Sequence, residues 1–182
     1  VLKDKIGIPD LIAEDVWHAN QRPKMEEYGN SHLFLALRQY HWQDKSLQET
    51  EVMLLVGPNY VVSVRHGNGA DFARVRSRAQ EEPELLKQGT GFVLYAILDI
   101  IVDRYFPIIL EFEKRVDAIE NKMFEQAEFG LAERKELAKN LHEIRRELGQ
   151  FKQGVEPVLE ITLKLFGGRV PRICHALGEY FQ

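Results

Sequence analysis

The sequence contains a single cysteine, Cys174, among its 182 residues. An internal disulfide framework is therefore excluded, and one thiol is typical of a protein kept in a reducing compartment. Long apolar runs are also missing, because none approaches the roughly 20 residues that a transmembrane helix requires. The nearest, residues 92–101, is interrupted by Asp99. We expect a soluble chain of the intracellular type.

Positive charge is not in excess. The chain carries 24 Lys and Arg residues against 28 Asp and Glu residues, a net charge of -4. Nucleic-acid binding relies on clustered positive charge, so this balance predicts no nucleic-acid partner. Enzyme signatures are missing too: there is no glycine-rich phosphate loop or nucleophile elbow, and Cys174 has no neighbouring base. The sequence therefore predicts neither an enzyme nor an organic cofactor.

The first residues predict a short helix over residues 8–18, because Pro9 suits a first helical turn. Its buried face is expected to contain four apolar residues: Leu11, Ile12, Val16 and Trp17. A break follows at residues 21–24, since the residue before a proline is disfavoured in a helix.

Three strands are predicted next. Residues 32–41 are apolar at successive positions, as in a central strand covered on both faces. Residues 51–56 and 60–65 flank a Gly-Pro-Asn turn at 57–59 and predict a hairpin. Asp71 then resembles the N-cap of another helix.

From residue 91 the apolar spacing alternates between three and four, which is typical of a helix packed lengthwise on another helix. One seam is expected at Tyr95, Leu98, Val102, Tyr105, Ile109, Phe112, Val116, Ile119 and Met123, and the second at Leu137, Leu141, Ile144, Leu148, Phe151 and Val155. These two helices would form an antiparallel hairpin, the first over residues 91–126 with a kink at Pro107. A further helix is expected to open at residues 172–182.

Taken together, these patterns predict an α/β part at residues 1–90, in which helices cover a sheet, followed by an all-α part at residues 91–182. The second part would contain the long antiparallel hairpin and the start of the next helix. Its mixed charges are expected to form the solvated outer face of the hairpin.

Two blocks near the start of the sequence are distinctive: residues 11–16, Leu-Ile-Ala-Glu-Asp-Val, and residues 20–26, Asn-Gln-Arg-Pro-Lys-Met-Glu. They resemble the Leu-x-x-Glu-Asp and Gln-Arg-Pro-Lys-x-Glu signature in the cytosolic domain of CorA-type magnesium/cobalt channels. Residues 33–37, 49–52 and 94–106 also match, in family order. The resemblance implies an α/β/α sandwich whose first strands precede this chain, and a stalk and two membrane spans that follow it. We therefore expect a truncated cytosolic domain that cannot conduct ions by itself.

The resemblance also implies two divalent-cation sites between subunits, to which Glu14, Asp15 and Asp99 contribute. Adjacent acids on a helix point about 100° apart, so Glu14 and Asp15 are expected to serve different ions. Asp99 interrupts an apolar stretch, and the alternative is a core carboxylate paired with an arginine. Asp103 is a weaker candidate ligand. His18 is weaker too, since imidazole suits Zn²⁺, Co²⁺ or Ni²⁺ better than Mg²⁺.

By resemblance, the expected function is metal sensing for a Mg²⁺ and Co²⁺ channel. That channel would form a homopentamer at the cytoplasmic side of the inner membrane, held there by helices that this chain lacks. The isolated chain is expected to be monomeric or weakly associated. Three alternatives stay open: a zinc-transporting member of the superfamily, a soluble coiled-coil scaffold, and a metal-dependent hydrolase whose carboxylates converge within one chain.

Overall fold

A four-stranded antiparallel sheet lies at the centre of the fold. The computed structural model describes residues 8, 10–67, 71–125 and 129–166. Within these residues the strand order is β1-β2-β3-β4. The strands are β1 (Lys24–Tyr28), β2 (His32–Gln43), β3 (Ser46–Val56) and β4 (Val61–His66).

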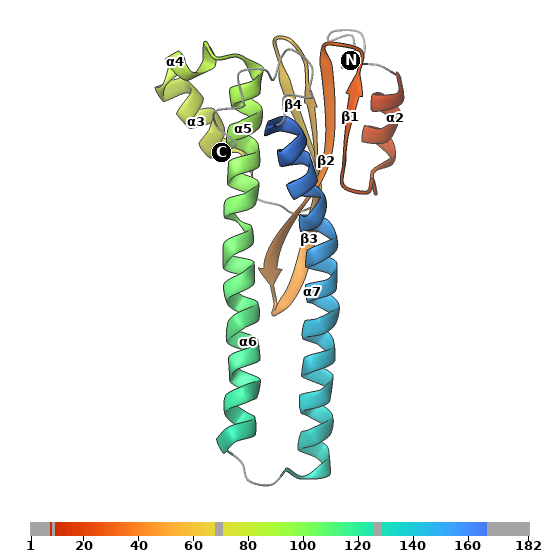
Figure 1. Ribbon diagram of the computed structural model, residues 1–182, viewed down its shortest axis with the longest axis vertical. Helices are drawn as coiled ribbons and strands as arrows, with labels where there is room; N and C mark the ends of the chain where they lie inside the picture. The colour runs from red at the N-terminus through yellow and green to blue at the C-terminus, as the bar shows by residue number, and fades with distance from the viewer. Residues whose placement is uncertain (1–7, 9, 68–70, 126–128, 167–182) are drawn as a thin grey trace.

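Helices cover both faces of this sheet (Figure 1). On one face, Phe34 and Ala36 of β2 pack with Ile12 of helix α2 (Asp10–His18). On the other, alternate β2 residues such as Leu35 pack in a larger core with Leu98 of helix α5 (Thr90–Asp103). Because successive strand residues point to opposite faces, the continuous apolar run of β2 serves both cores. The predicted α/β/α arrangement and central strand are confirmed.

The sheet contains pairings that the sequence did not predict. Strand β1 occupies part of the expected break, and Met25 pairs with Leu35 of β2. Strand β3 begins at Ser46, earlier than expected, because a tight turn at Asp44 and Lys45 joins it to β2. Both turn residues have positive φ, 49° and 64°, the conformation that two-residue hairpins require.

The helical part follows the predicted order. After β4 come α3 (Ala73–Glu81) and α4 (Pro83–Leu86), and Asp71 Oδ1 accepts a hydrogen bond from the Ala73 amide at 3.2 Å. The predicted long helix is divided into α5 and α6 (Tyr105–Glu125) at Arg104. The division is three residues before Pro107, whose ring and missing N–H disturb the preceding turn, so the predicted kink is confirmed.

Helix α7 (Leu131–Phe166) returns antiparallel to α6 and completes the hairpin (Figure 1). Its 36 residues span about 54 Å at 1.5 Å per residue. The helix continues through Pro157. Among the described residues, no helix combines the length and apolar character needed to cross a membrane. The helix expected at residues 172–182, with Cys174, lies outside the described residues.

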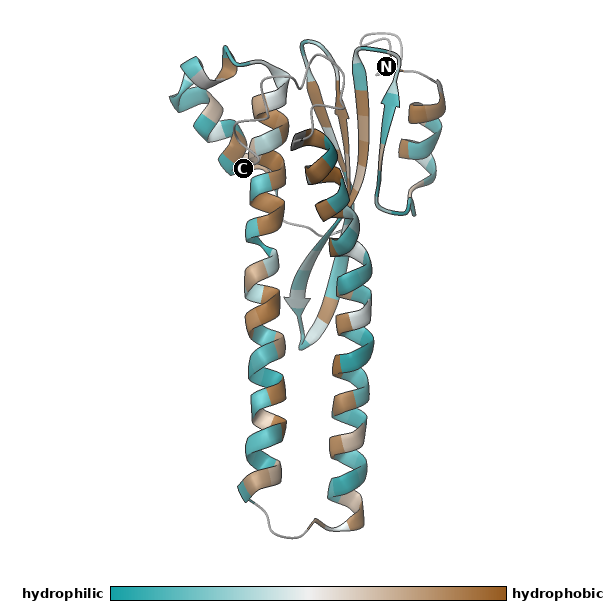
Figure 2. Ribbon diagram, viewed as in Figure 1, coloured by the Kyte–Doolittle hydropathy of each residue, from teal (hydrophilic) through white to brown (hydrophobic). Residues whose placement is uncertain are grey.

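Four of the fifteen predicted seam positions are wrong, because their side chains are exposed. Residues Leu137, Ile144 and Phe151 of α7 are buried as predicted, but Leu141 and Leu148 are 46% and 48% exposed. Buried α7 positions outside the predicted seam include Glu147, Gly154 and Ile161. In α6, Ile109 and Met123 are exposed, and Ile108 is buried in place of Ile109. Figure 2 shows the resulting alternation of apolar and polar bands along both helices.

The physical reason lies in what faces α7. Buried Tyr40 of β2 packs against Gly154, and its hydroxyl donates to the Gln150 carbonyl at 3.0 Å. Arg115 of α6 bonds to Glu147 at 2.6 Å. Small and polar side chains therefore fill positions where the spacing alone favoured leucine. The larger core joins residues from both sides of residue 90, and the division there stays a prediction.

An aromatic cluster ties the hairpin to the sheet. The Phe112 ring of α6 lies 5.2 Å from the Trp42 ring of β2 and 6.1 Å from the Phe151 ring of α7. Phe151 also lies 5.3 Å from Tyr40 and 5.6 Å from Tyr105. Edge-to-face aromatic contacts of this kind add to the burial energy of each ring.

We expect Phe112→Ala to destabilise the chain by about 3–5 kcal/mol, because a buried ring is lost and a cavity remains. Chemical denaturation would measure the free energy of unfolding. Phe106→Ala is the matched control, since Phe106 is 61% exposed, and it should change stability by less than about 1 kcal/mol. Equal effects of the two substitutions would contradict this account of the core.

Two glycines of α7 offer a second, internally controlled test. A Cβ at Gly154 would lie 2.8 Å from the Cε2 and Cζ atoms of Tyr40, whereas a Cβ at Gly149 meets nothing within 4 Å. Gly149→Ala should stabilise the chain by about 0.5–1 kcal/mol through helix propensity. Gly154→Ala should destabilise it by about 1–3 kcal/mol through overpacking. Thermal or chemical denaturation that gave both substitutions the same sign would overturn this assignment.

Candidate metal site

Helix α2 carries three of the five candidate ligands. Ile12 is fully buried and anchors the helix on the sheet. Leu11 and Trp17 are 65% and 84% exposed, so the predicted buried face is wrong at these two positions. The helix is short and uses a narrow apolar contact, which leaves Glu14 and His18 exposed on its outer side.

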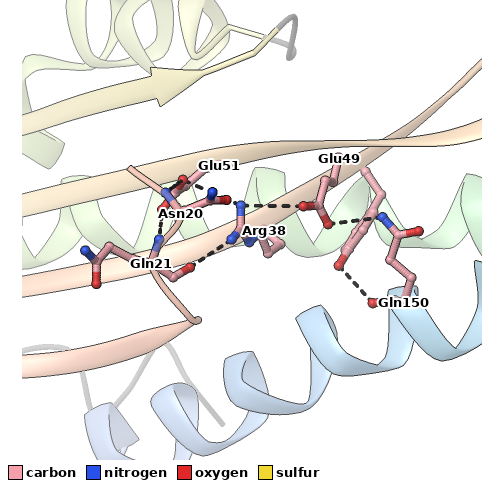
Figure 3. A network of polar contacts seen from close by, with 7 residues as sticks. Asn20, Gln21, Arg38, Glu49, Glu51 and Gln150 are labelled. Carbon is pink, nitrogen blue, oxygen red and sulfur yellow. Dashed lines mark hydrogen bonds and ion pairs between the residues drawn. The ribbon is translucent and has the colours of Figure 1, made fainter. Parts of the chain in front are cut away.

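The turn after α2 is held by a buried carboxylate. Glu51 of β3 is 4% exposed and accepts hydrogen bonds from the Asn20 amide at 2.7 Å and the Gln21 amide at 2.8 Å (Figure 3). Ala19 and Asn20 have positive φ, 52° and 59°, and this left-handed turn directs both amides toward the carboxylate. The Asn-Gln-Arg-Pro-Lys block thus has a structural role in fixing the end of α2.

Arg38 extends this network toward α7 (Figure 3). Its guanidinium donates to the Gln21 carbonyl at 2.9 Å and lies 3.6 Å from Glu51 and 3.7 Å from Glu49. Glu49 in turn accepts a hydrogen bond from the Gln150 side chain of α7 at 3.2 Å. Polar contacts therefore connect the end of α2 with the middle of α7.

Asp15 lies in a cluster that includes the first residues of β1. Its Oδ2 atom accepts a hydrogen bond from Lys24 Nζ at 2.8 Å, and the same ammonium lies 3.0 Å from Glu26 Oε1. Tyr28 donates its hydroxyl to Glu26 Oε2 at 2.8 Å. The side chains of Asp15, Lys24 and Glu26 are 24%, 29% and 40% exposed. The carboxylates of Asp15 and Glu26 therefore accommodate one positive charge between them, and that charge is the Lys24 ammonium.

Two pKa values reflect this cluster. Burial alone would lower the pKa of the Lys24 ammonium, but its hydrogen bonds to Asp15 and Glu26 outweigh that penalty, so the pKa is raised. Burial and the hydrogen bond to Glu26 raise the pKa of Tyr28 to about 12. Lys24 is therefore charged, and Tyr28 is a neutral donor, throughout the physiological range.

Asp99 and Asp103 lie on α5, one turn apart, and both are exposed. Asp99 is therefore not the core carboxylate that the alternative interpretation required. Helices α5 and α2 pack on opposite faces of the sheet, so one chain does not bring Asp99 together with Glu14 and Asp15 (Figure 1). This separation argues against a hydrolase whose carboxylates converge in one pocket.

The donor set suits a hard cation. Glu14, Asp15, Asp99 and Asp103 offer carboxylate oxygens, the ligands that Mg²⁺ prefers, and the outer side of α2 adds the His18 imidazole. Within the described ranges, no three His, Cys, Asp or Glu side chains are close enough to enclose an ion.

The family model for "CorA-like Mg2+ transporter protein" matches residues 1–180. The chain belongs to the CorA family. It is 28% identical over 180 residues to the cobalt/magnesium transport protein CorA of Thermotoga maritima, a match that covers 97% of this chain and 49% of that protein. It is also 28% identical over 121 residues to the magnesium transporter ALR1 of Saccharomyces cerevisiae, covering 65% of this chain and 14% of that one.

The fold is that of the CorA soluble domain. The solved structure of the soluble domain of CorA from Methanocaldococcus jannaschii superposes with a TM-score of 0.70 at 16% identity, covering 99% of this chain and 71% of that one. The complete CorA structure from the same organism gives 0.69, with 56% of its chain covered. The chain thus spans about half the length of its Thermotoga relative.

Sequence reasoning missed Lys24 and Glu26 as neighbours of Asp15. In the sequence, Lys24 and Glu26 stand out only as members of the block at residues 20–26. Since β1 was not predicted, nothing indicated that residues 24 and 26 share one side of a strand. Recognising that strand would have placed both near α2.

Glu51→Gln should lower the free energy of unfolding by about 1–3 kcal/mol, because a buried charged acceptor is lost beside Arg38. Hydrogen exchange at the Asn20 and Gln21 amides should become faster, since both donate to this carboxylate. Glu49→Gln is the control, because Glu49 is 39% exposed and accepts a hydrogen bond from neither amide. Hydrogen exchange at the Asn20 and Gln21 amides should therefore be unchanged in Glu49→Gln. Slow exchange at both amides in Glu51→Gln would contradict the role of Glu51.

Proposed function

We propose that this chain is the metal-sensing part of a divalent-cation channel, placed on the cytoplasmic side of the inner membrane in a homopentamer. Membership in a family described as Mg²⁺ transporters supports this, as does the Thermotoga relative named as a cobalt/magnesium transport protein. A transport family is consistent with our expectation that the chain is not an enzyme.

The observation that carries the proposal is the placement of the acids. Glu14 is exposed on the outer side of α2, and Asp99 and Asp103 are exposed on α5, over the opposite face of the sheet. Acids that converge within one chain would suggest a self-contained site. Acids exposed on opposite faces instead fit ligand sets that a neighbouring copy completes.

In this mechanism Asp15 would hold Mg²⁺ at one site between neighbouring subunits, Glu14 would contribute to a companion site, and Asp99 would serve as a further ligand at the same interface. Asp103 supports the Asp99 side. Bound Mg²⁺ neutralises the repulsion between the facing carboxylates and favours a symmetric, closed ring; when Mg²⁺ leaves, repulsion favours a looser arrangement. Mg²⁺ keeps several of its waters and touches few carboxylates, which gives the modest affinity that sensing requires.

The proposed ligands favour some ions over others. Carboxylates alone favour Mg²⁺, whereas Co²⁺, Ni²⁺ or Zn²⁺ would gain from a nitrogen ligand. His18 lies four residues after Glu14, so the two exposed side chains share one side of α2. A zinc-transporting function remains the second candidate on this observation. It requires His18→Ala to weaken the response to Zn²⁺ and leave the response to Mg²⁺ unchanged.

Asp15→Ala combined with Asp99→Ala in the full-length channel should raise the Mg²⁺ concentration needed for protection against protease by about tenfold or more. Limited proteolysis across a Mg²⁺ titration measures this. Transport should become less inhibited by internal Mg²⁺, and it should not be abolished, because no helix among the described residues could line a membrane pore. Glu113→Ala, an exposed acid of α6, is the matched control. Unchanged protection and inhibition in the double variant would remove the sensor assignment.

A further inference from the structure

A lysine ammonium occupies the centre of the Asp15 cluster. Lys24 Nζ lies 2.8 Å from Asp15 Oδ2 and 3.0 Å from Glu26 Oε1. Lys24 and Glu26 are two residues apart on β1, so both side chains lie on the same side of the strand, toward α2. The ammonium therefore bridges α2 and β1 as a positively charged link.

Glu26 has a second partner besides the lysine, and Asp15 is positioned through its helix. The Tyr28 hydroxyl donates to the second oxygen of Glu26 at 2.8 Å. Asp15 is positioned by α2, whose Ile12 is fully buried against the sheet. The Lys24 ammonium also lies 5.7 Å from the Phe34 ring centroid, and it ends a flexible four-carbon chain that is 29% exposed. Rotation of this chain can carry the ammonium into solvent.

We propose that Lys24 is a built-in competitor of the divalent cation, holding the position between Asp15 and Glu26 that the ion takes when it binds. This inference rests on the proposed role of Asp15 as a ligand. It adds Glu26 as a second carboxylate for the same ion. An ammonium and a divalent cation cannot share this position, because like charges within a few ångströms repel strongly.

Displacement of the lysine is feasible on energetic grounds. An ion pair that is one-quarter to one-third exposed is worth little, since both partners are partly hydrated. The ammonium can move to solvent by rotation of its side chain while the carboxylates stay in place. Each binding event must therefore break the lysine contacts, which raises the concentration of cation needed for occupancy.

The charge of Lys24 should set the affinity. Removing it should tighten binding by roughly three- to tenfold, since the ion no longer competes with the ion pair or meets the displaced charge. Lys24→Arg retains the positive charge, so it should leave the affinity for the divalent cation within about twofold of that of the natural chain. This pair of substitutions separates the effect of charge from the effect of altering the residue.

The test is a titration of the 182-residue chain with Mn²⁺ alone, with free Mn²⁺ read by electron paramagnetic resonance. We expect weak binding by the natural chain, tighter binding by Lys24→Met, and no tightening by Lys24→Arg. Adding Asp15→Asn or Glu26→Gln to Lys24→Met should remove the gain. Mg²⁺ should compete with the bound Mn²⁺. Lys24→Gln is a second charge-free variant should Lys24→Met fail to fold.

Equal affinity of Lys24→Met and the natural chain, including an absence of binding by both, would overturn the proposal. A gain that survives Glu26→Gln would overturn the assignment of Glu26. The sensor function is judged separately, by protease protection of the full channel with Asp15→Ala and Asp99→Ala. Loss of protection there, with no effect of Lys24→Met here, would leave the sensor function in place and remove only the competing lysine.

Discussion

The burial of Glu51 imposes the constraint on which the arrangement of α2 and β1 depends. A carboxylate removed from water is costly unless it is paired and hydrogen-bonded. Two backbone amides and the Arg38 guanidinium meet that requirement. The amides reach Glu51 only because Ala19 and Asn20 adopt the left-handed conformation. The turn that reverses the chain after α2 is thereby fixed, and with it the placement of Asp15 beside Lys24.

The same network joins elements that are distant in the sequence. Arg38 contacts both Glu51 and Glu49, and Glu49 accepts a hydrogen bond from Gln150 on α7. Next to these contacts, Tyr40 donates to the carbonyl of the same Gln150. A charged residue at the centre of β2 therefore connects the candidate metal-binding helix on one side with the hairpin on the other. Displacement of either element would alter hydrogen bonds at both ends of this network.

The sequence predicted the fold where one physical effect dominated. Strand β2 was recognised because its apolar run serves both faces, and the bend near Pro107 because proline lacks an N–H. Strand β1 was missed because Lys24, Glu26 and Glu27 mask its alternation, and its place is set by pairing with β2. The hairpin seam was wrong at Leu141 and Leu148 because a leucine repeat cannot indicate which of two neighbouring stripes is buried. Tyr40 and Arg115 decided that question, and both contacts depend on the tertiary fold.

The length of α7 has a mechanical consequence. The contacts of Tyr40, Tyr105 and Phe112 with Phe151 hold the hairpin near the sheet, while the first turns of α7 lie far from it (Figure 1). A rigid rod of about 54 Å acts as a lever. If α7 pivots by about 5° at one end, its other end travels by about 5 Å, which is close to one helical turn. A rearrangement too small to disturb the packing of the sheet is thus magnified into a displacement as large as the spacing between neighbouring strands.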